Sequence, residues 1–432
     1  MSKYIYKLSN YRAVQSAEIE IDGITVLAGE NGTGKSTLSR WLYYVVKVLC
    51  GYEELIDNKA LTDMAYIVRR LERTDNMLDD KNFNQFALYG DMNDVLYSNL
   101  TISEKAEQLC LFVKQYISFI NKKLLNHDVN DDWVRRLATL FDMENVKITD
   151  NKIFVDSIYQ KLISQINEIR DEALRKKEDR KPAIFKEIIP LSLDDFGDGN
   201  VSVGFVEDGV ELLTEERFNP TLNINKVIYY KTYELLDYLN RGSDFRDCLE
   251  TPIDKMTNQE ELVYRLICKA IDGNVTIADE EGLMLFHTKQ LHYKRNDGLD
   301  IPLRQAATGL ISFSYLARLL ENGYLRKGTL LIIDEPEAHL HPRWIVEYAR
   351  ILVLLQKMLD LKIVLSTHNP DMVAAIDAIA RKEGVADNTK FYFAKPSKEV
   401  EYKYVFEKQN SIGNIFDSFN VALTRIQAYG EE

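Results

Sequence analysis

Residues 29–36 read Gly29-Glu30-Asn31-Gly32-Thr33-Gly34-Lys35-Ser36, and Thr37 follows them. They fit the pattern G-x-x-x-x-G-K-[ST] without a mismatch. The apolar run Ile24 to Ala28 before them is typical of a buried strand, and apolar residues after them recur at helical spacing, at Leu38, Leu42, Val45 and Leu49. A glycine-rich turn between a strand and a helix directs backbone N–H groups at phosphate oxygens. We therefore expect a phosphate-binding loop, with Lys35 on the β- and γ-phosphates and Ser36 on Mg²⁺.

A second apolar run ends in two carboxylates and reads Leu330-Leu331-Ile332-Ile333-Asp334-Glu335-Pro336. Open α/β sheets bind ligands at the carboxyl ends of their strands, where these carboxylates would lie. Asp334 suits Mg²⁺ binding, and Glu335 is placed to polarise an attacking water. Taken alone, the pair fits a solvated loop equally well. The phosphate loop in the same chain favours the functional interpretation.

A third apolar run ends in a histidine and reads Ile363-Val364-Leu365-Ser366-Thr367-His368. A lone histidine usually has a structural role. His368, however, follows a strand expected to end at the same sheet edge, so its imidazole is predicted to reach the γ-phosphate.

Together these motifs resemble the ABC-class ATPase heads of the RecF, SMC and OLD groups. The resemblance rests on the phosphate loop, on D-E-P-E-A-H-L-H-P (Asp334 to Pro342) and on S-T-H-N-P (Ser366 to Pro370). Asn10-Tyr11-Arg12 fits the opening of that family. The chain most resembles the bacterial AAA15 ATPases of phage-defence systems such as PARIS and Septu. The similarity covers residues 1–50 and about 225–432, and it implies an α/β fold, an ABC-type P-loop head with an antiparallel β portion.

The resemblance also implies the composition of the site. ATP and Mg²⁺ are the expected cofactors, with Glu335, His368 and Lys35 as catalytic residues and with Ser36 and Asp334 on the metal. In that family a signature loop closes on the ATP of the other subunit, and Ala306-Ala307-Thr308-Gly309-Leu310 occupies its place. Thr308 and Gly309 are then nucleotide contacts. In ABC transporters a serine of the signature loop contacts the γ-phosphate; here that serine is missing or its contact is taken over by Thr308. The alternative is that these residues are a plain helix start capped by Thr308.

Between the motifs lies a long polar, helix-forming stretch. Two apolar stripes run from Ile102 to Leu124 and from Val155 to Ala173, and Thr101 to Glu104 fits a capping box. We predict a head made of residues 1–50 and 186–432, interrupted by a helical, short coiled-coil-like insertion over residues 51–185. The basic run Arg175 to Lys181 either meets DNA or is the solvated end of a helix, and its interspersed acids favour the latter.

Composition limits the function classes. The chain has 432 residues, 46% hydrophobic and 28% charged, with a net charge of −13, which excludes disorder, collagen and a disulfide scaffold. Its four cysteines are scattered, without a metal-binding pair. No apolar stretch is long enough for a membrane helix, so we expect no membrane association and a cytoplasmic protein. The acidity disfavours a surface that coats nucleic acid, although a local basic groove leaves DNA open as a partner.

The leading hypothesis is a slow, Mg²⁺-dependent ATPase that forms a homodimer or higher homo-oligomer around ATP. The resemblance implies a sensor or scaffold that controls a separate effector nuclease after a phage-derived trigger. The segment after His368 is too short for the TOPRIM nuclease domain of OLD proteins, which is consistent with a separate effector. A RecF-like DNA-repair ATPase and a nucleotide-dependent scaffold with little turnover are the alternatives.

Overall fold

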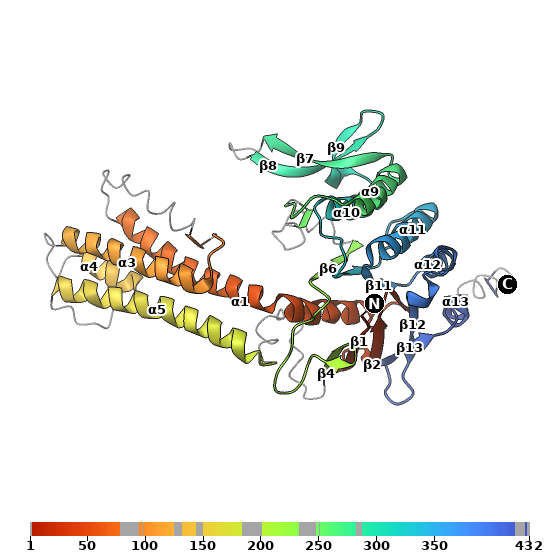
Figure 1. The fold of residues 1–432 in the computed structure, drawn as a ribbon, viewed down its shortest axis with the longest axis horizontal. Coiled ribbons are helices and arrows are strands. Elements are labelled where there is room, and N and C mark those ends of the chain that lie inside the picture. Colours follow the sequence, from red (N-terminus) through yellow and green to blue (C-terminus); the bar gives the residue numbers. More distant parts are fainter. Residues whose placement is uncertain are drawn as a thin grey trace. The chain divides into compact units, whose positions relative to one another are not determined.

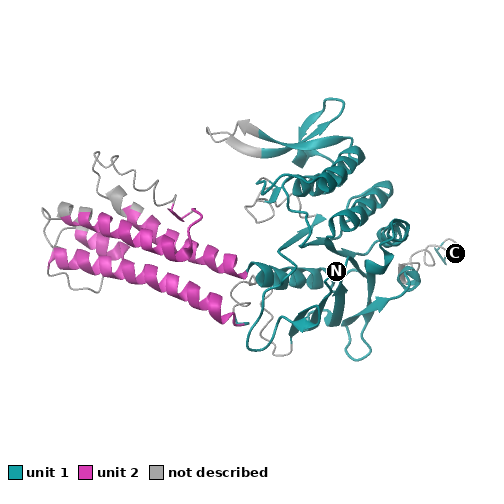
Figure 2. Cartoon of the chain, in the orientation of Figure 1, with its two compact units in different colours: residues 1–51, 182–432 teal, residues 52–181 magenta. Residues whose placement is uncertain are grey.

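A computed structural model describes residues 2–77, 95–96, 98–124, 132–143, 150–183, 201–232, 248–249, 251–281, 287–419 and 428–429. The chain divides into two compact units (Figure 2). The first contains residues 1–51 and 182–432, and the second contains residues 52–181.

The first unit is built on a large mixed sheet, which has ten strands in the described ranges (Figure 1). Their order is β5-β4-β1-β2-β13-β12-β3-β11-β10-β6. The strands are β1 (Tyr4–Tyr11), β2 (Val14–Ile21), β3 (Ile24–Ala28), β4 (Ser202–Glu207), β5 (Val210–Glu211), β6 (Lys226–Lys231), β10 (Thr329–Asp334), β11 (Lys362–Thr367), β12 (Thr389–Pro396) and β13 (Tyr404–Gln409).

One half of this sheet is parallel. Strands β12, β3, β11, β10 and β6 run in the same direction, and every residue of β3, β10 and β11 is buried. Continuous apolar runs such as Leu330 to Ile333 form strands of this kind, because helices cover both faces of a parallel sheet. The other half contains the antiparallel pairs β1–β2, β1–β4 and β4–β5. The predicted α/β fold with an antiparallel portion is therefore confirmed.

Helices of the first unit bury their apolar faces against the parallel strands and against one another. Their shared core includes Ile311, Leu352 and Ile376. Helix α9 packs on α10 and α11, and α11 packs on α12. The helices are α1 (Lys35–Met77, which continues into the second unit), α9 (Asn258–Ala270), α10 (Thr308–Glu321), α11 (Pro342–Leu359), α12 (Pro370–Glu383), α13 (Gly413–Phe419) and the short 3₁₀ turns η5 (Leu303–Gln305) and η6 (Ala386–Asn388).

A small antiparallel sheet adjoins these helices. It comprises β7 (Gly273–Glu281), β8 (His287–Arg295) and β9 (Asp300–Pro302). The turn at Asn296-Asp297-Gly298 joins β8 to β9, and the turn at Glu207-Asp208-Gly209 joins β4 to β5. Gly298 and Gly209 both adopt positive φ there, as tight hairpin turns require.

The second unit is helical. It contains the part of α1 beyond Gly51 together with α3 (Ile102–Leu124), α4 (Asp132–Leu140) and α5 (Asn151–Asp179). Helix α3 packs along α5, as the two apolar stripes predict. The predicted capping box is present, because the Glu104 N–H donates to Thr101 Oγ1 at 3.3 Å and the Thr101 N–H to Glu104 Oε2 at 2.8 Å.

The basic run at the end of α5 is paired with acids of its own unit. Lys177 contacts Asp57 at 2.6 Å, and Arg180 contacts Glu53 at 2.8 Å. Pairing of this kind favours the structural interpretation of the run over a DNA-binding one. No helix in the described ranges has an apolar stretch long enough to cross a membrane.

Asn369 and Pro370 have a structural role at the start of α12. The Asn369 side-chain oxygen accepts the Asp371 N–H at 2.7 Å and the Met372 N–H at 3.3 Å, so Asn369 caps the helix. Pro370 occupies the first helical position, where its fixed φ fits and its missing N–H has no cost. This cap fixes the point at which the chain turns from β11, through His368, into α12.

Asn369→Ala is expected to lower the free energy of unfolding by about 1 kcal/mol, because two helix N–H groups lose their acceptor. Asn369→Ser, which retains a capping oxygen, is the matched control and should stay within about 0.5 kcal/mol of wild type. Urea unfolding followed by circular dichroism measures both. Equal stability of the alanine and serine variants would contradict a capping role.

Candidate functional site

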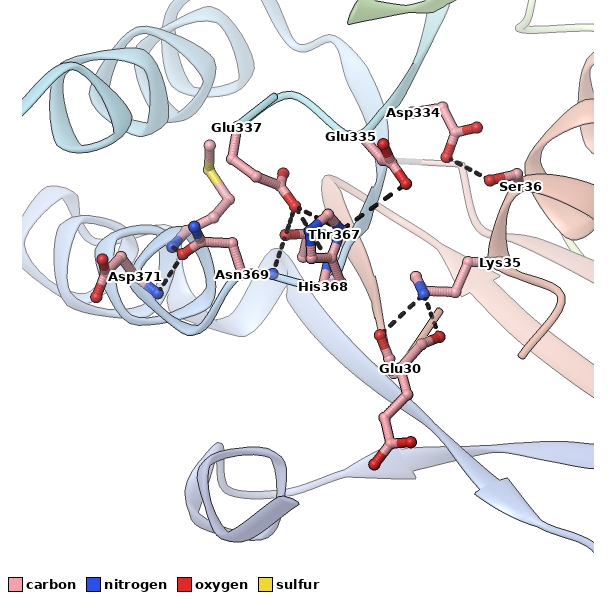
Figure 3. A network of polar contacts seen from close by, with 12 residues as sticks. Glu30, Lys35, Ser36, Asp334, Glu335, Glu337, Thr367, His368, Asn369 and Asp371 are labelled. Carbon is pink, nitrogen blue, oxygen red and sulfur yellow. Dashed lines mark hydrogen bonds and ion pairs between the residues drawn. The ribbon is translucent and has the colours of Figure 1, made fainter. Parts of the chain in front are cut away.

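The parallel register brings three motifs to one sheet edge (Figure 3). Ala28 at the end of β3 is paired with Thr367 of β11, and Ser366 of β11 is paired with Asp334 of β10. The residues that follow these strand ends therefore emerge side by side. The Glu335 N–H donates to the Ser366 carbonyl at 2.8 Å, which continues the pairing one step beyond β10.

The loop over residues 29–36 depends on glycine at its tight positions. Gly32 and Gly34 have φ of +83° and +95°, in the left-handed region that favours glycine. A Cβ on Gly34 would lie 2.8 Å from Val14 Cγ2, so the loop packs directly against the start of β2. Thr33 is buried and donates from Oγ1 to the Glu30 carbonyl at 2.9 Å. Glu30 and Asn31 themselves are exposed at the tip.

Lys35 lies inside this loop, at the first position of α1. Its Nζ donates to the carbonyl oxygens of Gly29 at 2.8 Å and Glu30 at 2.7 Å, and the residue is only 5% exposed. Burial lowers the pKa of Lys35, although the nearby carboxylates, Asp334 first among them, oppose the shift. The ammonium therefore faces oxygen acceptors within the loop, the type of atom that a phosphate also presents.

Ser36 and Asp334 form the contact between the loop and β10. Ser36 Oγ donates to Asp334 Oδ1 at 3.1 Å, and Thr37 follows in the first turn of α1. The other carboxylate oxygen, Oδ2, is buried without a hydrogen-bond partner among the described residues. Burial raises the pKa of Asp334, while the Ser36 hydrogen bond and the charge of Lys231, its register partner on β6, oppose this.

These two residues fit a magnesium ion. Mg²⁺ prefers oxygen ligands and is usually held by one or two carboxylates together with phosphate oxygens. A hydroxyl next to a carboxylate whose second oxygen lacks a partner meets that requirement. The described residues contain no cluster of three or more His, Cys, Asp or Glu side chains able to hold a metal alone. The protein ligands would thus be Ser36 and Asp334.

Glu335 and His368 face each other beyond the strand ends. His368 Nδ1 lies 3.8 Å from Glu335 Oε1, and 40% of the histidine side chain is exposed. Glu335 has φ of +54°, an uncommon conformation for a residue other than glycine. Such conformations cluster at functional sites, where the surrounding structure maintains them. Both side chains are accessible enough to meet a substrate at this edge.

Glu337 is a residue whose role sequence reasoning missed. Its Oε1 accepts the Thr367 hydroxyl at 2.7 Å and the His368 N–H at 3.0 Å, and it lies 3.4 Å from His368 Nδ1. The side chain is only 5% exposed, and burial raises its pKa. Glu337 therefore links the loop after β10 to the loop after β11. The sequence did contain a signal for this role. Glu337 is a third acidic residue, two positions after Glu335, and the neighbouring strand β11 ends at Thr367, directly before His368.

Thr308 and Gly309 lie at the start of α10, without a hydrogen bond to the phosphate loop among the described residues. Ala307 is the N-cap and provides no side-chain cap, so the alternative of a helix start capped by Thr308 is wrong. A Cβ on Gly309 would lie 2.9 Å from Trp344 Cε3 and 3.0 Å from Leu340 Cδ2. Close packing against the loop after β10 and against α11 thus requires glycine here. The structure brings Lys35, Ser36, Asp334, Glu335 and His368 to one edge and leaves this helix start apart from them.

Comparison with known proteins gives one family and a set of distant structures. A family model described as an AAA ATPase domain, AAA_15, matches residues 6–373. No curated protein matches the chain. The chain is similar to an Smc head bound to the C-winged helix domain of ScpA, with 10% identity, a TM-score of 0.40 and coverage of 96% of this chain and 98% of that one. It is also similar to the SMC head domain from Thermotoga maritima, with 11% identity, a TM-score of 0.36 and coverage of 95% and 100%. A third similar structure is the Smc head domain with a coiled coil and joint from Pyrococcus yayanosii, with 11% identity, a TM-score of 0.37 and coverage of 98% and 100%.

Glu337→Ala is expected to reduce kcat for ATP by about tenfold or more, because the His368 backbone loses its acceptor and the imidazole is no longer held in place. Glu337→Gln retains an acceptor oxygen and should recover most of the activity. Steady-state hydrolysis, with folding checked by circular dichroism, compares the two variants. If glutamine were as defective as alanine, the carboxylate would have a role other than positioning this loop.

Proposed function

This chain belongs to the AAA_15 family of AAA ATPase domains, and we propose that it binds and hydrolyses ATP at two sites, each formed between two copies of the chain. Its fold is that of an ABC-type P-loop ATPase head with a helical insertion. The observation that carries the proposal is the shared strand edge, where the phosphate loop, Asp334, Glu335 and His368 lie together.

ATP binding is assigned to the loop and to the start of α1. Backbone N–H groups of residues 29–34 and the helix N-terminus would surround the phosphates. Lys35 would exchange its two carbonyl contacts for β- and γ-phosphate oxygens, and Ser36 and Asp334 would hold Mg²⁺. The bound ion supplies positive charge to the phosphate oxygens. Because Lys35 and backbone dipoles provide the remaining neutralisation, a net charge of −13 is compatible with a triphosphate ligand.

Hydrolysis is assigned to Glu335 with His368. Glu335 would accept a proton from the attacking water or orient it, and His368 would contact the γ-phosphate. The separation of 3.8 Å between Glu335 Oε1 and His368 Nδ1 supports this pairing of roles. Glu337 supports this arrangement through the His368 N–H without touching the substrate itself.

The second half of each site would come from another copy of the chain. Thr308 and Gly309 start a helix whose N-terminus has no side-chain cap, which leaves its N–H groups for an anion. Because this helix makes no hydrogen bond to its own phosphate loop in the described ranges, it would meet the γ-phosphate held by a partner subunit. The result is a homodimer, or a higher homo-oligomer, with ATP between heads. Ala307 in place of a serine supports slow turnover.

The cycle would serve to control a separate protein. Resemblance to the PARIS and Septu ATPases supports a sensor or scaffold that holds an effector nuclease and releases or activates it when a phage-derived trigger binds. The acidic composition and the internally paired basic run on α5 favour a protein partner over DNA. A RecF-like repair role is correspondingly disfavoured.

Lys35→Ala is expected to abolish ATP binding, whereas Glu335→Gln should bind ATP, hydrolyse it at least about 100-fold more slowly and remain dimeric. The reason is that Lys35 contacts the phosphates in every state, whereas Glu335 acts only on the water. Nucleotide titration and size-exclusion chromatography with ATP distinguish the two. If Glu335→Gln hydrolysed ATP at the wild-type rate, Glu335 would not be the residue that activates the attacking water. If the wild-type protein formed an ATP-bound dimer but hydrolysed ATP at a rate close to background, a nucleotide-dependent scaffold would be favoured over an ATPase.

Co-expression with the product of the adjacent gene tests the effector proposal. Wild type should co-purify with that protein and confer phage resistance, whereas Lys35→Ala should lose the resistance. A chain that hydrolyses ATP normally but neither associates with that protein nor protects cells would refute the defence role and leave the ATPase assignment intact.

A further inference from the structure

A cavity of about 440 Å³ lies among α9, α10 and α11, and none of its lining residues belongs to the candidate site described above. Its volume is in the range of pockets that hold small ligands or a few side chains of a partner. Phe313, Trp344 and Ile351 contribute apolar surface, and charged side chains from α9 and α11 surround it, namely Lys269, Arg343, Glu347 and Arg350. We call this the α9–α11 groove.

The floor of the groove is aromatic and rigid. The rings of Phe313 and Trp344 meet edge to face, with centroids 5.4 Å apart, and Phe313 packs in the same manner on Tyr348 at 5.1 Å. Phe313 and Tyr348 are almost fully buried, whereas Trp344 is partly exposed. A partly exposed tryptophan held by buried rings is a surface to which an apolar side chain can bind without loss of order in the protein.

The rim of the groove is positively charged. Glu347 contacts Arg350 at 3.5 Å, which balances one of the three cations. Lys269 and Arg343 are exposed, and neither side chain makes an ion pair or hydrogen bond with any described residue. A chain of net charge −13 thus presents two uncompensated cations beside an aromatic floor. A ligand that complements this groove has an apolar group for the aromatic floor and at least two negative charges for the two cations.

We propose that the α9–α11 groove binds an acidic segment of a partner protein, with an apolar side chain on Trp344 and carboxylates at Lys269 and Arg343. This inference rests on the proposed control of a separate effector and specifies how such a partner is held. Nucleic acid fits less well, because binding a phosphate backbone draws on a row of Lys and Arg side chains, whereas the groove offers two uncompensated cations.

The groove has a direct connection to the start of α10. Trp344, which would touch the bound segment, is also the nearest neighbour of a Cβ built on Gly309, at 2.9 Å. A movement of the indole toward Gly309 would therefore displace the first turn of α10. Because that turn is the part proposed to meet the ATP of a second subunit, a bound segment would alter hydrolysis.

A fluorescein-labelled hexapeptide of two glutamates, leucine, phenylalanine and two glutamates is the probe, measured by anisotropy without nucleotide. It should bind wild type, and the double variant Lys269→Glu/Arg343→Glu should weaken binding by about tenfold or more. The matched control Lys382→Glu/Lys398→Glu, which reverses two exposed cations elsewhere in the head, should change affinity by less than about twofold. Equal affinity for a counterpart with lysines in place of the glutamates would overturn the proposal. Binding of an oligothymidylate that the Lys269/Arg343 variant abolishes would assign the groove to nucleic acid instead.

The coupling is tested by ATP hydrolysis with saturating hexapeptide. Wild type should change its rate by about twofold or more, and the Lys269→Glu/Arg343→Glu variant should retain the basal rate and not respond. A bound peptide that leaves the wild-type rate unchanged would refute the link through Trp344. Because binding is measured without nucleotide, a chain that binds the peptide but never hydrolyses ATP would refute the proposed ATPase cycle and leave the groove assignment standing.

Discussion

The parallel pairing of β3, β11 and β10 is the constraint on which the candidate site depends. The three strands contribute one motif each, and the phosphate loop after β3 is about 300 positions from the two motifs after β10 and β11 in the sequence. Since a one-residue slip in register turns side chains to the opposite face, Asp334 would no longer meet Ser36 if β10 and β11 were mispaired. The fully buried strands prevent this, because any slip would expose apolar surface or bury unpaired polar groups.

Burial of charge at the sheet edge has a cost that local hydrogen bonds offset. Three charged residues are nearly inaccessible: Lys35, Asp334 and Glu337. Burial lowers the pKa of Lys35 and raises the pKa of Asp334 and of Glu337, which in each case favours the neutral form. Two carbonyls compensate Lys35, and a hydroxyl with a backbone N–H compensates Glu337. Asp334 has one oxygen without a partner, so the site is least satisfied where an added cation would bind.

Local patterns were sufficient to predict the apolar strands β3, β10 and β11, the capping box at Thr101 and the motif positions, because apolar runs and Thr-x-x-Glu act over a few residues. They could not show that Glu337 reaches Thr367, since that contact depends on register between distant strands. The same holds for Gly309, whose requirement for glycine comes from Trp344, a residue far along the chain that no spacing rule connects to it. The alternative in which Thr308 caps α10 is wrong, because residue type alone favoured Thr308 whereas the backbone places Ala307 at the N-cap position.

The carboxylate of Glu337 links the loops after β10 and β11, in addition to the backbone hydrogen bond between Glu335 and Ser366. One loop carries His368, and the other continues through His339 toward α11 and the packing surface of Gly309. Because the buried carboxylate accepts hydrogen bonds from both Thr367 and the His368 N–H, a displacement of the loop after β10 would be transmitted directly to the loop that carries His368.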